Sequence, residues 1–144
     1  MSPVILAQTD TTVGFLSQNQ QKLYEIKSRE TSKPFLKVYP NFKSFLVSKN
    51  RVPNNFKRLV RHSKKTTFIV KQNAFRVAKN HLNSQILRDS LWLYSTSANK
   101  TGENFDREFC QNSADIIIED INGLVENSPS NLLKINRIKK RKLR

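Results

Sequence analysis

The chain has 144 residues, a hydrophobic content of 37% and a formal net charge of +15 at pH 7. This length allows one domain with a small packed core and excludes a second core. No apolar run approaches the roughly 18 residues of a membrane span, and Cys110, as the only cysteine, cannot build an internal disulfide framework. Because Cys110, His62 and His81 match no zinc-ligand spacing either, we expect a cytoplasmic protein without a structural metal or a membrane partner.

The charge is distributed unevenly along the chain. Residues 31–88 contain 14 bases and no acid, residues 127–144 contain 7 bases and no acid, and residues 89–126 contain 8 acids and 2 bases. A field this positive favours anionic partners such as RNA, DNA, nucleotides or anionic lipid. AT-rich codon usage is an alternative explanation for the many lysines, but it explains the long acid-free stretch less well.

The pattern of apolar, capping and turn residues predicts strands that alternate with helices. Runs rich in β-branched residues predict strands at 4–7, 35–39, 66–70, 74–77, 91–94, 115–118 and 132–138. Capping residues, helical spacing and a proline in a first turn predict helices at 20–28, 42–48, 53–61, 78–88 and 105–112. Residues 71–73 fit a hairpin turn. The alternation is typical of a layered α/β domain, here over residues 1–136, followed by a basic tail, 137–144, that we expect to be frayed.

A hydroxyl-rich segment follows the first predicted strand. It contains Thr9, Asp10, Thr11 and Thr12 ahead of Gly14. Hydroxyl and backbone N–H groups beyond a strand end suit a small polar ligand, because open α/β sheets bind ligands there. A polar turn with a capping Asp or Thr is the alternative.

Two cations, Lys27 and Arg29, lie near the predicted end of the first helix. Side chains two positions apart do not face each other on a helix, so both reach one anion only if the helix ends at Lys27. Lys would then supply a point charge and Arg a bidentate fork for carboxylate or phosphate. Otherwise the pair consists of two solvated charges at a helix C-terminus.

A third polar segment, Ser95-Thr96-Ser97-Ala98-Asn99, follows the predicted strand 91–94. In an extended chain Ser95, Ser97 and Asn99 share one face, so they would line a pocket past the strand end. An ordinary polar loop is the alternative. The glycine-rich phosphate loops, the zinc-protease motif and the nucleophile elbow of known enzyme classes are absent.

Taken in chain order, these segments resemble the motifs of the YrdC/YciO-type family, which includes L-threonylcarbamoyladenylate synthases of tRNA modification. Thr9-Asp10-Thr11 with Gly14 is similar to its PTDTxYGL-like segment, and Lys27 with Arg29 is similar to its KxR motif. The remaining similarities are Thr67 at the end of a GPxT segment, Arg76 in an AVR segment, Ser95–Asn99 as STSAN, Ser130 in a late serine segment and Arg137 as a following arginine.

The resemblance implies a single YrdC-like domain, with a twisted mixed sheet and helices packed around it. It implies condensation of L-threonine, bicarbonate and ATP to threonylcarbamoyl-AMP and pyrophosphate, after which other tRNA-modification proteins act on a tRNA adenosine. It assigns catalysis to Lys27 and Arg29, and threonine binding to Thr9, Asp10 and Thr11. Nucleotide binding falls to Thr67, Arg76, Ser95, Ser97, Asn99, Ser130 and Arg137. Mg²⁺ is expected to arrive with ATP, since no acidic pair in the motifs would hold it.

The chain also departs from the family pattern. Gln8 and Val13 replace the usual proline and tyrosine, Glu30 replaces a proline after KxR, and residues 63–65 replace a Gly-Pro segment. The helix that usually precedes the first strand is missing, so we interpret the chain as a shortened member. These changes alter backbone shape while keeping charged and hydroxyl groups. A non-catalytic module of the same fold that binds double-stranded RNA or tRNA is therefore the alternative function.

Overall fold

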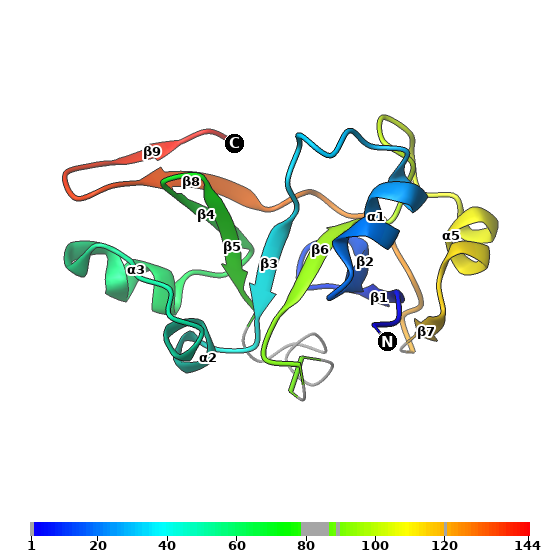
Figure 1. Ribbon diagram of the computed structural model, residues 1–144, viewed down its shortest axis with the longest axis horizontal. Coiled ribbons are helices and arrows are strands. Elements are labelled where there is room, and N and C mark those ends of the chain that lie inside the picture. The colour runs from blue at the N-terminus through cyan, green and yellow to red at the C-terminus, as the bar shows by residue number, and fades with distance from the viewer. Residues whose placement is uncertain (1, 79–86, 89, 120) are drawn as a thin grey trace.

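The computed structural model describes residues 2–78, 87, 88, 90–119 and 121–144. Within these residues the chain forms one nine-stranded mixed sheet with helices packed against it, which confirms the predicted α/β fold (Figure 1). The predicted helix 78–88 lies almost entirely outside the described residues. In the part of the chain that is described, no helix is long and apolar enough to cross a bilayer.

The sheet has the strand order β7-β1-β2-β6-β3-β5-β4-β8-β9. The strands are β1 (Ile5–Gln8), β2 (Val13–Ser17), β3 (Leu36–Tyr39), β4 (Thr66–Val70), β5 (Asn73–Val77), β6 (Leu93–Ser97), β7 (Ile116–Ile118), β8 (Asn131–Ile135) and β9 (Lys140–Lys142). The pairs β1–β7, β3–β5 and β4–β8 are parallel, and the others are antiparallel. The helices are α1 (Gln20–Lys27), α2 (Phe42–Val47), α3 (Lys57–His62) and α5 (Arg107–Ser113), with the 3₁₀ turn η1 (Asn54–Phe56) before α3.

Short polar side chains fix where three of these helices begin. The Asn19 side chain accepts a hydrogen bond from Lys22 N at 3.2 Å, and the Asn41 side chain accepts one from Ser44 N at 2.8 Å. Asp106 does the same for the first turn of α5. Each side chain satisfies a backbone donor that the helix itself leaves free, which stabilises a helix by about 1 kcal/mol.

The helices cover one face of the sheet. The strand register places Phe15, Tyr94 and Phe75 on this same face. Phe75 stacks on Phe45 of α2 with ring centroids 4.3 Å apart, while Phe15 packs in a second cluster with Cys110 of α5. In Figure 1, α2 and α3 lie at the end of the sheet that carries β4 and β5, and α1 and α5 lie at the other end. On the opposite face Leu16, Val38 and Leu93 pack with Ala78 and Leu87 in a third buried cluster, and the cleft described below lies on this same face.

Three elements differ from the sequence-based expectations. β2 was not expected, because all five of its residues are buried and the stretch lacks the alternation that marks a strand. β6 begins at Leu93 and continues through Ser97, so Ser95 and Ser97 lie in the strand rather than beyond it. The expected fraying of residues 137–144 is wrong, since β9 pairs with β8 across Ile135–Lys140 and Leu133–Lys142.

Candidate functional site

A cleft of about 470 Å³ lies on the face of the sheet away from the helices. Register explains its floor: Ser97 pairs with Gly14, Ser95 pairs with Leu36, and Arg76 pairs with Thr67, so these side chains share one face. The rim is formed by three segments far apart in the chain: the β1–β2 loop with Thr9, Thr11 and Thr12, the segment after α1 with Arg29, Pro34 and Phe35, and the C-terminal segments with Pro129, Ser130 and Arg144.

The β1–β2 loop is folded on its own hydroxyl groups. Thr9 Oγ1 donates to Thr12 O at 2.6 Å and accepts from Thr11 N at 3.2 Å. Thr9 and Thr11 are both buried, with their Oγ1 atoms 3.2 Å apart. Gly14 sits close behind, where an added Cβ would lie 2.9 Å from Thr96 O and 3.0 Å from Thr9 Cγ2. The glycine thus lets this β1–β2 loop, which we call the threonine loop (residues 9–12), lie directly against β6.

The helix α1 ends at Lys27, which is the condition that brings the two cations to one place. Ser28 follows with a left-handed φ of 51°, and this turn carries Arg29 away from the helix axis. Lys27 Nζ donates to Ser97 O at 2.8 Å and to Asn99 Oδ1 at 2.6 Å. Lys27 is 3% exposed, and it lies behind Ser97 rather than among the residues that line the cleft.

Burial changes the acid–base properties of Lys27. Loss of solvation, aided by repulsion from Arg29, lowers the pKa of Lys27 from 10.5 to about 8. The ammonium group remains mostly protonated at neutral pH. Its three donors face only oxygen atoms of Ser97 and Asn99, the third being Ser97 Oγ at 3.5 Å. Lys27 therefore supplies a fixed positive charge directly beneath the hydroxyl group of Ser97.

Arg29 lines the cleft and keeps unused donor capacity. Its guanidinium lies 4.9 Å from the ring centroid of Phe35, and Nη2 donates to Pro34 O at 3.4 Å. Its Nε is buried without a hydrogen-bond partner among the described residues. An unsatisfied buried donor costs about 1–3 kcal/mol, so an anionic or carbonyl oxygen in the cleft would relieve this cost.

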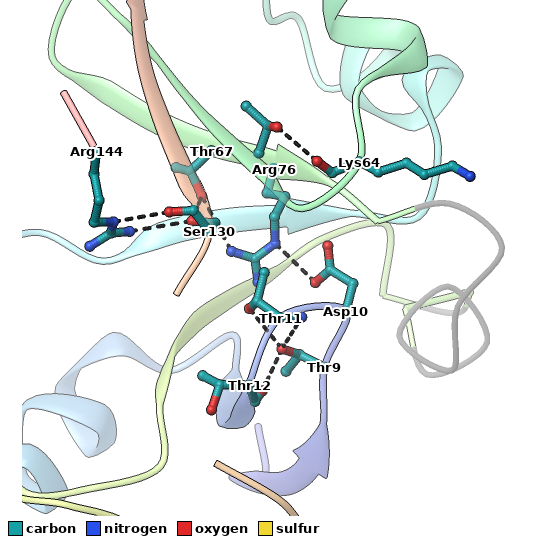
Figure 2. A network of polar contacts seen from close by, with 10 residues as sticks. Thr9, Asp10, Thr11, Thr12, Lys64, Thr67, Arg76, Ser130 and Arg144 are labelled. Atoms are coloured by element: carbon teal, nitrogen blue, oxygen red, sulfur yellow. Dashed lines mark hydrogen bonds and ion pairs between the residues drawn. The ribbon is translucent and has the colours of Figure 1, made fainter. Parts of the chain in front are cut away.

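A chain of polar contacts crosses the cleft from the threonine loop to the C-terminal segment (Figure 2). Arg76 Nε donates to Asp10 Oδ1 at 3.0 Å, and Arg76 Nη1 donates to Thr67 Oγ1 at 3.3 Å. Thr67 Oγ1 and Ser130 Oγ are 2.8 Å apart, and Arg144 Nε donates to Ser130 O at 2.9 Å. Burial lowers the pKa of Arg76, which is 4% exposed, and the neighbouring Asp10 carboxylate opposes this shift.

The structure brings together most of the residues singled out in the sequence. Lining or directly supporting the cleft are Thr9, Asp10, Thr11, Lys27, Arg29, Thr67, Arg76, Ser95, Ser97, Asn99 and Ser130. Arg137 does not join them, because it lines a different hollow, where its carbonyl accepts from Asn55. Among the described residues, no group of three His, Cys, Asp or Glu side chains is placed to hold a metal ion.

Sequence reasoning missed Arg144 and the apolar part of the rim. Arg144 reaches Ser130 only because β9 folds back along β8, and β9 is a run of exposed charges with no strand pattern. Phe35 was expected only as part of a strand. Its position beside Pro34 and two residues before Lys37 carried no signal that its ring would face Arg29.

A YrdC-like α/β domain with a polar, cation-lined cleft is the class of protein that this fold and site define. The model of the Sua5/YciO/YrdC family, described as "Telomere recombination", matches residues 3–140. The chain therefore belongs to the Sua5/YciO/YrdC family.

Solved structures agree with this assignment at the level of the fold. Two structures of P. abyssi Sua5 are similar: a double variant, with a TM-score of 0.81 and 14% identity, and a complex with L-threonine, with a TM-score of 0.78 and 15% identity. E. coli YciO gives a TM-score of 0.75 at 17% identity, and 99% of the chain covers 82% of YciO. HypF in a phosphate- and nucleotide-bound form gives a TM-score of 0.70 at 17% identity, and the match covers 26% of HypF.

The chain spans about half the length of the Sua5 structures that it matches. The match covers 99% of this chain, but only 52% and 50% of the two Sua5 chains. No curated protein matches the chain by sequence.

Proposed function

We propose that the cleft binds L-threonine and ATP and condenses them with bicarbonate to threonylcarbamoyl-AMP. The observation that carries the proposal is that Lys27 binds Ser97 and Asn99 at the base of a cleft, which Arg29, Ser97 and the threonine loop line together. Family membership supports it, as do the L-threonine bound by Sua5 and the nucleotide bound by HypF, two proteins that share the fold.

The proposed reaction has two steps. The amino group of threonine attacks the carbon of bicarbonate, which forms a carbamate and releases water. A carbamate oxygen then attacks the α-phosphorus of ATP, which forms the acyl phosphate bond and breaks the bond to pyrophosphate. Negative charge gathers near the carbamate and the phosphates, so preorganised cations at that place would lower the barrier. Catalysis would rest on positioning and charge neutralisation.

Each part of the cleft has a proposed role. Thr9 and Thr11 would bind threonine, and Asp10 would act through Arg76, to which its carboxylate is already bound. Lys27 and Arg29 would hold the carboxylate and phosphate charges. Nucleotide contacts would come from Thr67, Arg76, Ser95, Ser97, Asn99 and Ser130, with Arg144 in the role expected of Arg137. Mg²⁺ would enter as part of the ATP substrate.

The test is pyrophosphate release with threonine, bicarbonate and ATP, each omitted in turn. Lys27→Ala and Arg29→Ala are each expected to lower the rate by about 10²-fold, the usual effect of removing one preorganised charge donor. Lys43→Ala, which removes an exposed cation outside the cleft, is the matched control. Full activity in Lys27→Ala would refute the assignment. No release by the wild type, together with no binding of threonine, would favour the non-catalytic RNA-binding module instead.

A further inference from the structure

The two edges of the sheet carry opposite charge. Within the described residues β7 forms one edge and β9 forms the other, since they stand first and last in the strand order. Residues 101–126, which contain β7, hold seven acids and one base, whereas residues 127–144, which contain β9, hold seven bases and no acid. In Figure 1 β7 lies at the lower right and β9 at the upper left. The fold therefore carries two neighbouring segments of the sequence to an acidic edge and a basic edge.

The β7 edge has the exposed apolar side chains that a missing neighbouring strand would leave. Ile116 and Ile117 are 42% and 44% exposed, and they lie on opposite faces because side chains alternate along a strand. Ile121, just beyond the strand, is 99% exposed. Ile116 N donates to Val4 O at 3.1 Å on the β1 side, so by alternation the N–H and C=O groups of Ile117 face the open side. One further strand would pair with these groups and cover both isoleucines.

The β9 edge is also open, and it is cationic. Leu143 N donates to Leu132 O at 2.8 Å on the β8 side, so by the same alternation the N–H and C=O groups of Lys140 and Lys142 face the open side. All three residues of β9 are exposed, and Ile138 in the preceding turn is 84% exposed. Among the described residues, no carboxylate forms an ion pair with a β9 cation. This edge can therefore pair with a strand that brings negative charge.

Charge decides which edges can meet. Antiparallel pairing of β7 with a second β7 centred on Ile117 would set Asp115 of one copy opposite Glu119 of the other, and pairing of β9 with a second β9 would set cations opposite cations. Like charges directly opposite each other destabilise a sheet. The side chains of Asp115 and Glu119 are 53% and 38% exposed, so both remain accessible to a β9 strand. The methylene stems of its lysines would cover the isoleucines while the ammonium groups reach these carboxylates.

We propose that copies of this chain associate head to tail, with β9 of one copy added alongside β7 of the next. The sheet then continues from one molecule into another. The two contact surfaces differ, so a bound copy still offers one free edge, and association continues to chains or rings larger than a dimer. The net charge of +15 does not prevent this contact, because exposed charges are largely screened beyond about 8 Å at physiological salt. Neither edge strand lines the cleft, and the proposal does not depend on the chemistry proposed there.

The test is complementation between two edge variants, measured by sedimentation velocity over a wide concentration series at physiological salt after nuclease treatment. Ile117→Pro removes the outward N–H of β7, and Lys142→Pro removes an outward N–H of β9, while the N–H groups that face the neighbouring strand remain. Val47→Ser, which shortens an exposed apolar side chain of α2 away from both edges, is the matched control. Circular dichroism and melting temperatures check folding. If a proline variant does not fold, Ile117→Lys and Lys140→Glu/Lys142→Glu replace the pair, since each disturbs the charge match at one edge.

The wild type and Val47→Ser are expected to form species larger than dimers as the concentration rises. Each edge variant alone is expected to associate at least about tenfold more weakly, because strand addition requires the free backbone donors of both edges. An equimolar mixture of the two variants is expected to associate again, since one variant keeps an intact β9 and the other an intact β7.

Four results would overturn the proposal. They are a wild type that remains monomeric at every concentration, a wild type that stops at a symmetric dimer, an edge variant that associates alone as well as the wild type, and a mixture of folded variants that does not associate. Because nucleic acid is removed first, association that depends on it would appear as the first of these results. Pyrophosphate release does not enter the measurement, so failure of this proposal and failure of the proposed function are distinguished.

Discussion

Arg76 and Asp10 form an ion pair at 3.0 Å that joins the middle of the sheet to the loop after β1, across 66 positions of the chain. Their side chains are 4% and 11% exposed, so the pair is shielded from water. The contact holds the threonine loop over the floor of the cleft. It also orients the Arg76 guanidinium toward Thr67, at the start of the polar chain that ends at Arg144.

Removing Asp10 is expected to destabilise the protein strongly. Asp10→Ala leaves the buried Arg76 charge without its partner, and breaking such a pair costs about 3–5 kcal/mol of unfolding free energy. Urea unfolding measures the loss. Glu119→Ala, which breaks the exposed pair with Arg107 at 2.8 Å, is the control and is expected to change stability little. A small loss for Asp10→Ala, or losses of Asp10→Ala and Arg76→Met that simply add in the double variant, would contradict a coupled pair.

Gly14→Ala is expected to disturb the threonine loop by overpacking. The new methyl group would lie 2.9 Å from the backbone oxygen of Thr96, which cannot move without displacing β6. Overpacking of this kind costs about 1–3 kcal/mol, and it would be read as a lower urea midpoint. Gly102→Ala has open space around its Cβ, though at a φ of 84°, and so it separates crowding from backbone strain. Retention of both stability and threonine affinity in Gly14→Ala would count against the close packing described.

The lowered pKa of Lys27 gives activity and stability opposite pH dependences. As pH rises through about 8, Lys27 loses the positive charge that the proposed reaction uses, so pyrophosphate release is expected to fall. Below pH 8 both folded and unfolded chains hold the proton, and the folded chain bears the full cost of a buried charge. Between pH 8 and 10.5 only the unfolded chain keeps it, so the contribution of Lys27 to unfolding free energy rises with pH.

This contribution is measured by comparison with Lys27→Met. That variant keeps every other titratable group of the protein and lacks only the Lys27 amine. The stability of the wild type relative to Lys27→Met is expected to rise by at most about 3–4 kcal/mol across this window, since one pKa unit corresponds to about 1.4 kcal/mol. A difference that stays flat with pH would mean that the Lys27 ammonium group is not desolvated. If pyrophosphate release stayed constant from pH 7 to pH 10, the positive charge of Lys27 would not be needed for the reaction.

Arg29→Lys tests geometry at constant charge. Lysine cannot reproduce the stacking on Phe35 or the planar fork whose Nε is left without a partner, so the positive charge alone would remain. We expect ligand affinity, measured by calorimetry with threonine and with ATP, to fall by about tenfold, the equivalent of roughly 1.4 kcal/mol. Lys43→Arg is the control for an exchange at an exposed site. Unchanged affinity in Arg29→Lys would mean that only charge matters at this position.

Arg144→Ala is expected to weaken ATP binding more than threonine binding. Arg144 binds Ser130 on the rim that faces the threonine loop, so its removal takes a cation from the phosphate side alone. Calorimetry on the same two ligands measures the contrast. An equal fall in affinity for both would indicate that Arg144 supports the whole rim, which would contradict a specific phosphate contact.

Local signals in the sequence were enough to predict part of the cleft, while Thr67, Arg76 and Ser130 were assigned to it only through the family resemblance. The spacing of Lys27 and Arg29 required a helix that ended at Lys27, and α1 does end there. The alternation of Ser95 and Ser97 required a shared face, and the register of β6 gives them one. These relationships depend on neighbouring residues only, which is why a single sequence reveals them.

Long-range relationships could not be predicted in this way. The pairing of β9 with β8 involves Lys140, Arg141 and Lys142, whose side chains are exposed and carry no hydrophobic pattern. Because of that pairing Arg144 joins the cleft, while Arg137 lines a separate hollow. β2 was missed for the opposite reason, because a strand buried on both faces shows no alternation.

The pairing of β4 with β8 also bears on how the protein folds. Thr66–Val70 pairs with Asn131–Ile135, so one wall of the cleft depends on a pairing between segments separated by a long stretch of chain. Folds rich in such pairings have high contact order and fold slowly, because loop entropy is lost before the pairing compensates for it. We therefore expect that a partly synthesised or partly refolded chain has no cleft, and that ligand binding appears in the same slow kinetic phase as the native core.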